Sequence, residues 1–255
     1  MLNNVIVRNM YNRYINEYIN EFRETGFAPD SRAIEKFSLY LMELMEAKIN
    51  ITAHVSPVDI IRENFLDSLS CLQAGFELAD KKIIDIGTGG GFPGLPLKIA
   101  VDSINLHLLE ATGKKVEFLN NLIKKLSLDN IYVHQGRAED FGQNSEFREN
   151  FDVAFARAVA ALPVLLEYVL PFVKTGGIFI AQKGKKYSEE IDLSAQSLKI
   201  LGGEILDIKP VKLPYDNIDK RLIVIKKISP APLKYPRRNG IPLKRPLGGH
   251  YHGKE

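Results

Sequence analysis

The residues most able to do chemistry lie in a glycine-rich stretch that directly follows a short apolar run. The stretch DIGTGGGFPG, residues 85–94, carries five glycines between positions 87 and 94. A tight glycine turn between a strand and a helix brings backbone N–H groups to the carboxyl edge of a sheet, where nucleotide-like ligands bind. The stretch therefore predicts a loop that approaches a ligand closely, with Gly87, Gly89 and Gly91 as contacts.

Two ligand templates fit this loop. Gly89, Gly91 and Gly94 satisfy the dinucleotide fingerprint GxGxxG. The second template places an acid two residues before the first glycine, and Asp85 occupies that position. Both templates expect a further acid at the end of the second strand to accept the ribose hydroxyls, and Glu110 stands there. Asp85 favours a ligand with a positive group over a pyrophosphate.

The elements that must position these residues alternate between short apolar runs and helical stretches from residue 82 onward. The apolar runs are KIIDI, INLHLLE, NIYVHQG, FDVAFARA and GIFIAQKG, with the helical stretches PGLPLKIA, GKKVEFLNNLIKKL and ALPVLLEYVLPFV between them. This alternation predicts a parallel sheet with helices on both faces. The last two runs, 203–213 and 221–227, lie too close together for a helical crossover and predict an antiparallel hairpin.

The predicted fold is therefore α/β, doubly wound and mostly parallel, with a C-terminal antiparallel hairpin. Such a hairpin is foreign to the usual dinucleotide fold and is typical of S-adenosylmethionine-dependent methyltransferases. That cofactor brings an ammonium, a sulfonium, a ribose and an adenine, and no phosphate. We expect it as the cofactor, with Ala138 and Glu139, after the third strand, beside the adenine edge.

The chain before the sheet is predicted to be a helical cap. Apolar residues recur at helical spacing from Met10 to Phe22 and from Ile34 to Met45, and a third helix is expected to begin with Ser56 as its cap and Pro57 at its first position. We expect a cap at 1–78, a cofactor-binding core at 79–228, and a basic, non-helical segment rich in proline and glycine at 229–255, docked on the core.

In methyltransferases of this type, residues after the fourth strand contribute to the chemistry at the methyl acceptor. Here they are FARAVAAL, residues 155–162. The (D/N)PP(Y/F) turn of amino-group methyltransferases is missing there. Cys71, the only cysteine, lies far away in sequence and disfavours a covalent mechanism. An acceptor that is already nucleophilic, such as guanine N7, needs alignment and no general base. Arg157 either forms an ion pair, with Asp85 or Glu139 as candidates, or holds the surroundings of the cofactor or the guanine.

Positive charge is concentrated at the C-terminal end. Residues 229–255 carry six Lys/Arg and one acid, whereas residues 1–80 carry seven Lys/Arg and twelve acids. Arg237, Arg238, Lys244 and Arg245 are expected to contact RNA phosphates, a solvated tail being the alternative. Lys183, after the fifth strand, is expected to point into the same cleft. Because the tail is distant in sequence from the glycine loop, we expect it to act on RNA and hardly at all on the cofactor.

Composition excludes several classes of protein. No apolar run reaches the roughly 18 residues of a membrane span, and the polar N-terminus is unlike a signal peptide. A single cysteine allows neither an internal disulfide nor a multi-cysteine metal site. We expect a cytoplasmic monomer without a metal.

Six segments together resemble the bacterial small-subunit (16S) ribosomal RNA guanine-N7 methyltransferases, also called the glucose-inhibited division protein B family. They are NIT (50–52), ENFLDSL (63–69), DIGTGGGFPGLPLKI (85–99), GRAEDF (136–141), FARAVAAL (155–162) and YPRRNGIPLKRPL (235–247). The resemblance spans about residues 35–247. It implies S-adenosylmethionine-dependent formation of N7-methylguanosine in 16S ribosomal RNA. It also implies cofactor contacts at Gly87, Phe92, Ala138, Glu139 and Arg157.

The chain departs from this family pattern at Asn64, where His is common. Three other functions are compatible with the residues: a small-molecule methyltransferase with the same cofactor site, a dinucleotide-dependent oxidoreductase, and a non-enzymatic RNA-binding protein with an inactive pocket. The small-molecule enzyme has no obvious use for the basic tail. Titration with S-adenosylmethionine and with NAD separates the oxidoreductase from the others.

Overall fold

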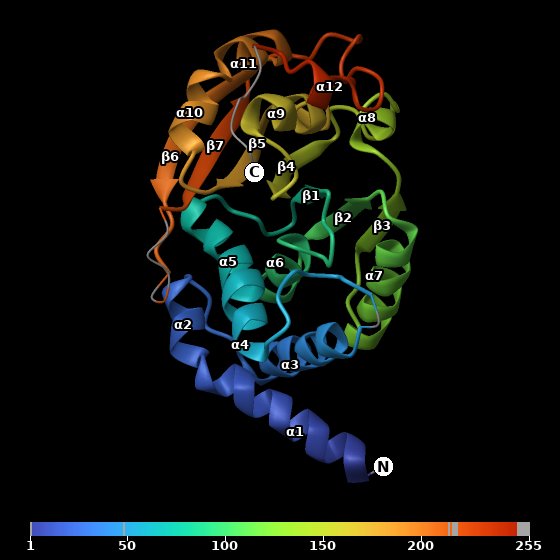
Figure 1. Cartoon of the computed structure of the whole chain (residues 1–255), viewed down its shortest axis with the longest axis vertical. Coiled ribbons are helices and arrows are strands. Elements are labelled where there is room, and N and C mark those ends of the chain that lie inside the picture. The colour runs from blue at the N-terminus through green and yellow to red at the C-terminus, as the bar shows by residue number, and fades with distance from the viewer. Residues whose placement is uncertain (1, 48, 214, 216–218, 249–255) are drawn as a thin grey trace.

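The computed structural model describes residues 2–47, 49–213, 215 and 219–248 (Figure 1). Most of the connection inside the predicted hairpin, 214–220, lies outside the described residues. So does the end of the basic segment, from residue 249 onward.

The N-terminal part is helical, as predicted, and forms a cap below the sheet (Figure 1). It consists of α1 (Leu2–Glu17), α2 (Ile19–Glu24), α3 (Ser31–Glu46) and one unbroken helical run made of α4 (Pro57–Asp59), the π-helix η1 (Ile60–Leu66), α5 (Asp67–Leu69) and the 3₁₀ helix η2 (Ser70–Ala74). Ser56 caps the run by accepting the N–H of Asp59 at 3.1 Å, which confirms the predicted start. Asp30 caps α3 in the same way through Ala33 N.

Among the described residues, seven strands form one sheet in the order β3-β2-β1-β4-β5-β7-β6. The first five are parallel, and β7 is antiparallel to both β5 and β6, which confirms the predicted hairpin. The strands are β1 (Lys82–Ile86), β2 (Asn105–Glu110), β3 (Ile131–Gln135), β4 (Phe151–Arg157), β5 (Val173–Lys183), β6 (Gly203–Pro210) and β7 (Arg221–Lys227). A dinucleotide fold with the order 3-2-1-4-5-6 has no strand inserted between the fifth and sixth, so this topology favours the methyltransferase alternative.

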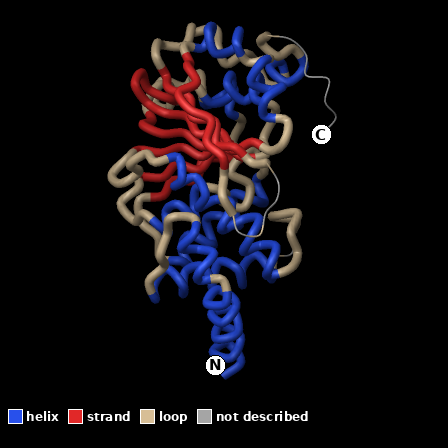
Figure 2. Tube along the Cα trace, turned by 90° about the vertical axis from the view of Figure 1, so that its left-hand side faces the viewer, coloured by secondary structure: helices blue, strands red, loops and turns tan. Residues whose placement is uncertain are grey.

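Helices pack on both faces of the sheet, which Figure 2 shows edge-on as a twisted layer between them. They are α6 (Gly94–Ala100), α7 (Gly113–Leu126), α8 (Ala138–Phe141), α9 (Leu162–Val169), α10 (Tyr187–Asp192), α11 (Ala195–Leu201) and α12 (Ile241–Lys244). The short helix α12 corrects the expectation that the C-terminal segment is free of helix, since Pro242 stands in its first turn, where proline fits a helix.

The sheet separates two apolar cores. One core joins the cap, α6 and α7 to the sheet and contains Phe37, Phe65 and Leu108. The other lies under α9 and α11 and reaches the C-terminal segment at Tyr235. Side chains of a strand alternate between faces, so Asp85 of β1 lies on the cap side while its neighbours Ile84 and Ile86 belong to the other core.

Candidate functional site

A two-part cleft opens at the carboxyl ends of the parallel strands. The part under the cap, here the cap cavity, measures about 370 Å³. The part at the ends of β2, β3 and β4, here the edge cavity, measures about 330 Å³. Both are lined by Gly87 and Ala158, so the two cavities meet at the glycine loop. An elongated ligand with two chemically different ends fits such a cleft.

The glycines of the loop have different functions. Gly87 has φ +70° and lies so close to Val159 that a Cβ would approach that side chain to 2.7 Å. Gly91 must also lack a side chain for the loop to pack, because a Cβ there would lie 2.5 Å from the side chain of Leu95. Gly89 differs: among the described residues, the nearest atom to a Cβ there is Lys115 Nζ at 4.0 Å. Gly89 and Gly87 therefore face the cleft, and Gly91 lies outside the lining of both cavities.

Asp85 braces the loop from below. It is fully buried, and its Oδ2 accepts Thr88 Oγ1 at 2.6 Å and Gly94 N at 2.9 Å. Its Oδ1 has no hydrogen-bond partner within the described residues. Burial raises the pKa of this carboxyl to about 6, although both hydrogen bonds act in the opposite direction. Asp85 is not among the described residues lining either cavity, so its observed role is to hold the glycine loop.

The raised pKa of Asp85 predicts a pH-dependent effect of Asp85→Asn. The folded state holds this proton between about pH 4 and 6, where the unfolded chain has lost it, so the carboxylate lowers stability increasingly as pH rises through that window. Asparagine keeps an acceptor for Thr88 and Gly94 without the charge. We expect the variant to be more stable than the parent by roughly 2–3 kcal/mol above about pH 6.

Urea denaturation of both proteins at about pH 4, 6 and 8 measures this difference. It should shrink towards zero at the lowest pH. A difference that stays constant across the range would show that the Asp85 carboxyl does not titrate in this window.

Glu110 ends β2, as predicted, and borders the edge cavity. Its Oε2 accepts Gly89 N at 2.9 Å and its Oε1 accepts Thr112 N at 2.8 Å. A carboxylate has about four lone-pair positions, so two backbone hydrogen bonds leave acceptor capacity for a vicinal diol. Glu110 both fixes the glycine loop and presents an acceptor to the edge cavity.

The far wall of the edge cavity comes from the turn after β3. Ala138 and Glu139 line it together with Tyr168 of α9. Burial, followed by the charges of Glu139 and Glu167, raises the pKa of Tyr168 to about 12, so its phenol stays protonated as a donor. The structure thus brings the predicted residues Gly87, Glu110, Ala138 and Glu139 together around one cavity.

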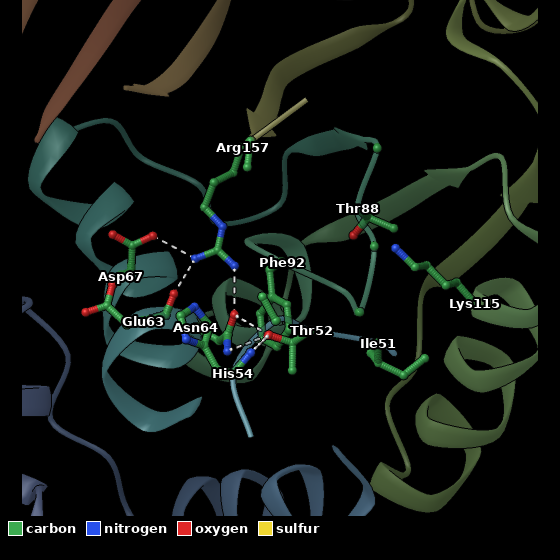
Figure 3. Close-up of a pocket in the computed structure, with 15 residues that line it drawn as sticks. Ile51, Thr52, His54, Glu63, Asn64, Asp67, Thr88, Phe92, Lys115 and Arg157 are labelled. Carbon is green, nitrogen blue, oxygen red and sulfur yellow. Dashed lines mark hydrogen bonds and ion pairs between the residues drawn. The ribbon is translucent and has the colours of Figure 1, made fainter. Parts of the chain in front are cut away.

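Arg157 ends β4 and points towards Glu63, Asn64 and Asp67 of the cap (Figure 3). Its Nη1 donates to Asp67 Oδ2 at 2.7 Å and to Glu63 O at 2.9 Å. The expected carboxylate partners Asp85 and Glu139 were therefore wrong, and the partner is Asp67, 90 positions earlier in the chain. Asp67 begins α5 of the cap and Arg157 ends β4, so the pairing depends on how the cap packs on the sheet.

The cap cavity contains a connected polar network. Asn64 is buried, donates to Thr52 Oγ1 at 3.2 Å, and accepts from Arg157 Nη2 at 3.3 Å. Asn64 therefore has a structural partner on each side, at the position where the chain departs from the family pattern that it resembles. His54 lies beside this network, its backbone N–H bonded to Thr52 Oγ1 (Figure 3). The π-helical turn that holds Asn64 belongs to a class of distortion that is frequent at functional sites.

An aromatic stack joins the glycine loop to the cap. The rings of Tyr40 and Phe92 are parallel within 3°, with their centroids 5.4 Å apart. Tyr40 Oη donates to the carbonyl of Gly90 at 2.5 Å. The guanidinium carbon of Arg157 lies 5.2 Å from the ring centroid of Phe92, a cation–π arrangement. Phe92 lines the cap cavity, so the cap holds the loop in place and also forms one wall of the site.

The predicted RNA-binding residues divide into two groups. Arg238, Lys244 and Arg245 are exposed. Arg237 instead forms a bidentate pair with the fully buried Glu167, with distances of 2.6–3.1 Å from Nε and Nη2 to the carboxylate oxygens. Lys183 pairs with Glu190 at 2.7 Å, and its side chain is 9% exposed. For both of these residues, RNA contact stays a prediction.

The C-terminal segment reaches the edge cavity. Leu243 lines it, and Gly240 N donates to Glu139 Oε1 at 3.0 Å. Distance in sequence from the glycine loop is therefore not distance in space, and the expectation that the tail hardly acts on the cofactor stays a prediction.

Several cleft residues escaped the sequence analysis. Thr52 and Asp67 lie in the segments NIT and ENFLDSL, whose resemblance to the family was the available signal. Lys115 and Tyr168 carried no signal, because each is an ordinary polar position on a helix. Within the described ranges, no three or more His, Cys, Asp or Glu side chains gather to hold a metal ion. None of the described helices has both the length and the apolar character needed to cross a membrane.

Comparison with known proteins agrees with this geometry. The family model described as rRNA small subunit methyltransferase G (GidB) matches residues 33–219. The ribosomal RNA small subunit methyltransferase G of Thermoanaerobacter pseudethanolicus is 43% identical to this chain, over 93% of this chain and 100% of the relative. The protein of the same name from Alkaliphilus metalliredigens is also 43% identical, over 88% of this chain and 95% of the relative.

Solved structures confirm the predicted fold. An S-adenosylmethionine-dependent methyltransferase from Aquifex aeolicus aligns with a TM-score of 0.50 and 17% identity over 67% of this chain and 94% of that one. At this identity the likeness is one of fold alone. The match of the family model over most of the chain, with two relatives that it spans almost completely, establishes that the chain belongs to the GidB family of small-subunit ribosomal RNA methyltransferases.

Proposed function

We propose that this protein transfers a methyl group from S-adenosylmethionine to N7 of a guanine in 16S ribosomal RNA of the small subunit. The two-part cleft is the observation that carries the proposal. In the edge cavity, Glu110 can accept hydrogen bonds from the ribose hydroxyls, and the wall at Ala138 can contact an adenine. The cap cavity lies on the other side of the glycine loop. The cofactor fits with its nucleoside in the edge cavity and its methyl group directed into the cap cavity.

The residues around the cap cavity suit alignment better than acid–base catalysis. Glu63 and Asp67 are paired with Lys220 at 3.1 Å, and Asp67 also holds Arg157, so neither carboxylate is a free base. Guanine N7 has an exposed lone pair and no proton to remove, so orientation towards the methyl group is sufficient. Arg157, fixed by three partners and by the ring of Phe92, is a positioning residue in this mechanism.

The chemistry of the rest of the chain favours RNA over a small-molecule acceptor. Lys244 ends α12, which borders the edge cavity, Arg238 and Arg245 lie on either side of that helix in the sequence, and all three are exposed. A small acceptor does not need cations outside the cleft, whereas RNA binding depends on phosphate neutralisation. Action on ribosomal RNA would place the protein in the cytoplasm. We propose that it acts there as a monomer.

Methyl transfer to purified small-subunit RNA and to small subunits tests the proposal, with the product mapped as N7-methylguanosine. RNA already methylated by the enzyme serves as the control, because it should accept no further methyl group. Methylation at another atom would contradict the N7 assignment. Failure with every RNA substrate, together with transfer to a small metabolite, would favour the small-molecule alternative.

A non-covalent mechanism predicts that Cys71→Ala retains methyl transfer. Cys71 is 2% exposed and is not among the described residues lining either cavity. Burial, and then the negative charge of Asp67, raises the pKa of its thiol, so the thiolate needed for nucleophilic attack is disfavoured. Turnover is expected to stay within about twofold of the parent. A folded variant without activity would contradict the non-covalent mechanism.

A further inference from the structure

The C-terminal segment follows a fixed path over the core, held by Arg148. The guanidinium of Arg148 donates to the carbonyls of Ala231 at 2.6 Å, Tyr235 at 2.7 Å and Pro232 at 3.2 Å. Arg237 then anchors the next turn to the buried carboxylate of Glu167 and also donates to Arg245 O at 2.7 Å. Charged side chains thus hold the segment at both ends of residues 231–245.

This path ends with α12 at the mouth of the edge cavity. Gly240 N bonds to Glu139 Oε1 at 3.0 Å, which ties the start of α12 to the turn after β3. Leu243 is 63% exposed and lines the cavity. An exposed leucine at the mouth of a cavity is shielded from water when a ligand fills the cavity, and this burial is favourable.

The residues that flank Leu243 have the opposite chemistry. Lys244 and Arg245 follow it directly, Arg238 precedes α12, and all three are exposed. None of them is among the described residues that line the edge cavity. One short segment therefore presents an apolar side chain to the cleft and cations to the outside, where a polyanion has access to them.

We propose that the segment 238–245 is a shared wall of the site, in which Leu243 covers the adenine of the cofactor while Arg238, Lys244 and Arg245 bind RNA phosphates. Each ligand then stabilises the position of the segment that the other one contacts, and the two bind with positive coupling. By linkage, the factor by which RNA strengthens cofactor binding equals the factor by which the cofactor strengthens RNA binding. This inference rests on the proposed function for the identity of the polyanion, but the contact of Leu243 with the nucleoside does not.

The first test uses no RNA. S-adenosylhomocysteine, which keeps the nucleoside and cannot react, is titrated into the parent protein and into Leu243→Ala by calorimetry. Loss of the apolar cover should weaken binding about fivefold to tenfold. Leu233→Ala is the matched control, because Leu233 is 79% exposed in the C-terminal segment before residue 238 and is not among the described residues lining the edge cavity. The affinity of this variant should stay within about twofold of the parent. Equal affinities of Leu243→Ala and the parent for S-adenosylhomocysteine would contradict the proposal that Leu243 covers the adenine.

The second test measures coupling. S-adenosylhomocysteine affinity is determined with and without small-subunit RNA, for the parent and for the double variant Lys244→Ala, Arg245→Ala. RNA should tighten the affinity in the parent and do so less in the double variant. The slope of log RNA affinity against log salt should fall by about 0.7–0.9 for each phosphate-binding side chain that is removed. Arg32→Ala should leave the slope unchanged, because Arg32 is an exposed residue of α3, a cap helix that lies on the other side of the sheet from α12 in Figure 1.

Methyl transfer by the parent, measured alongside, separates the two hypotheses. Transfer to RNA with no effect of RNA on cofactor affinity would overturn the coupling and leave the proposed function intact. Absence of transfer to any small-subunit RNA would overturn the proposed function, while the RNA-free comparison of Leu243→Ala with Leu233→Ala would still decide the wall.

Discussion

Replacing Gly89 with valine is expected to weaken S-adenosylmethionine binding by about 100-fold or more while leaving the protein folded. A side chain at this position extends into the cap cavity, where among the described residues the nearest atom to its Cβ is Lys115 Nζ at 4.0 Å. The protein itself therefore has room for the added atoms, and the ligand does not. Calorimetric titration with S-adenosylmethionine measures the loss, and circular dichroism confirms the fold.

Backbone strain needs its own control, because Gly89 has φ +59° and a branched side chain is unfavourable there. Gly176→Val supplies it. Gly176 has φ +89° and open space around its Cβ position among the described atoms, and it is exposed in the first part of β5, outside the described lining of the cleft. Both variants should lose similar stability, but only Gly89→Val should lose the cofactor. Cofactor binding by Gly89→Val within about threefold of the parent would contradict the assignment of the loop.

Arg157→Ala is expected to lower methyl transfer by about 100-fold, because a small misplacement of the reacting groups costs that much in an alignment mechanism. The substitution removes the hydrogen bonds to Asp67, Glu63 and Asn64 and the cation over Phe92. Asp67 keeps Lys220 as its second partner at 3.1 Å, so the buried carboxylate is not left unpaired. Turnover at saturating cofactor is the measurement.

Arg62→Ala is the matched control, since Arg62 forms a bidentate pair with Glu21 inside the cap, at 2.9 and 3.2 Å, and is not among the described residues lining the cleft. It should change stability with little effect on turnover. A positioning role for Arg157 also predicts partial recovery in Arg157→Lys, which keeps one charge for Asp67 but cannot reach three partners at once. Equal turnover of Arg157→Ala and the parent would show that Arg157 is purely structural.

Local features of the fold were predictable because their causes are local. The cap residue Ser56 acts on an N–H three residues away, the glycines 87–94 form a turn within the chain, and a connection as short as residues 214–220 permits only an antiparallel pair. Glu110 was found because strand ends align at one edge of a parallel sheet.

Contacts between elements far apart in sequence were not predictable in this way. Arg157 needed a carboxylate, and the sequence suggested Asp85 or Glu139, yet the packing of the cap on β4 selected Asp67. Leu243 had no periodic pattern to indicate that it lines a cavity, since its position depends on the arginines that hold the segment leading to it. Spacing along the chain does not encode such pairs, because many packings satisfy the same pattern.

The stack of Tyr40 on Phe92, with the bond from Tyr40 to Gly90, has a consequence for how the molecule opens in solution. Tyr40 of α3 contacts the glycine loop, so a subglobal unfolding that exposes the amides of α3 also breaks these contacts. The loop is then released and the ligand site is lost. A bound ligand then adds its binding free energy to the free energy of that opening. The exchange rate of the slowest amide protons of α3 therefore reports whether the ligand site is occupied, although these amides do not line the site. Hydrogen exchange in the cap thus reads out the cofactor without a probe in the cleft.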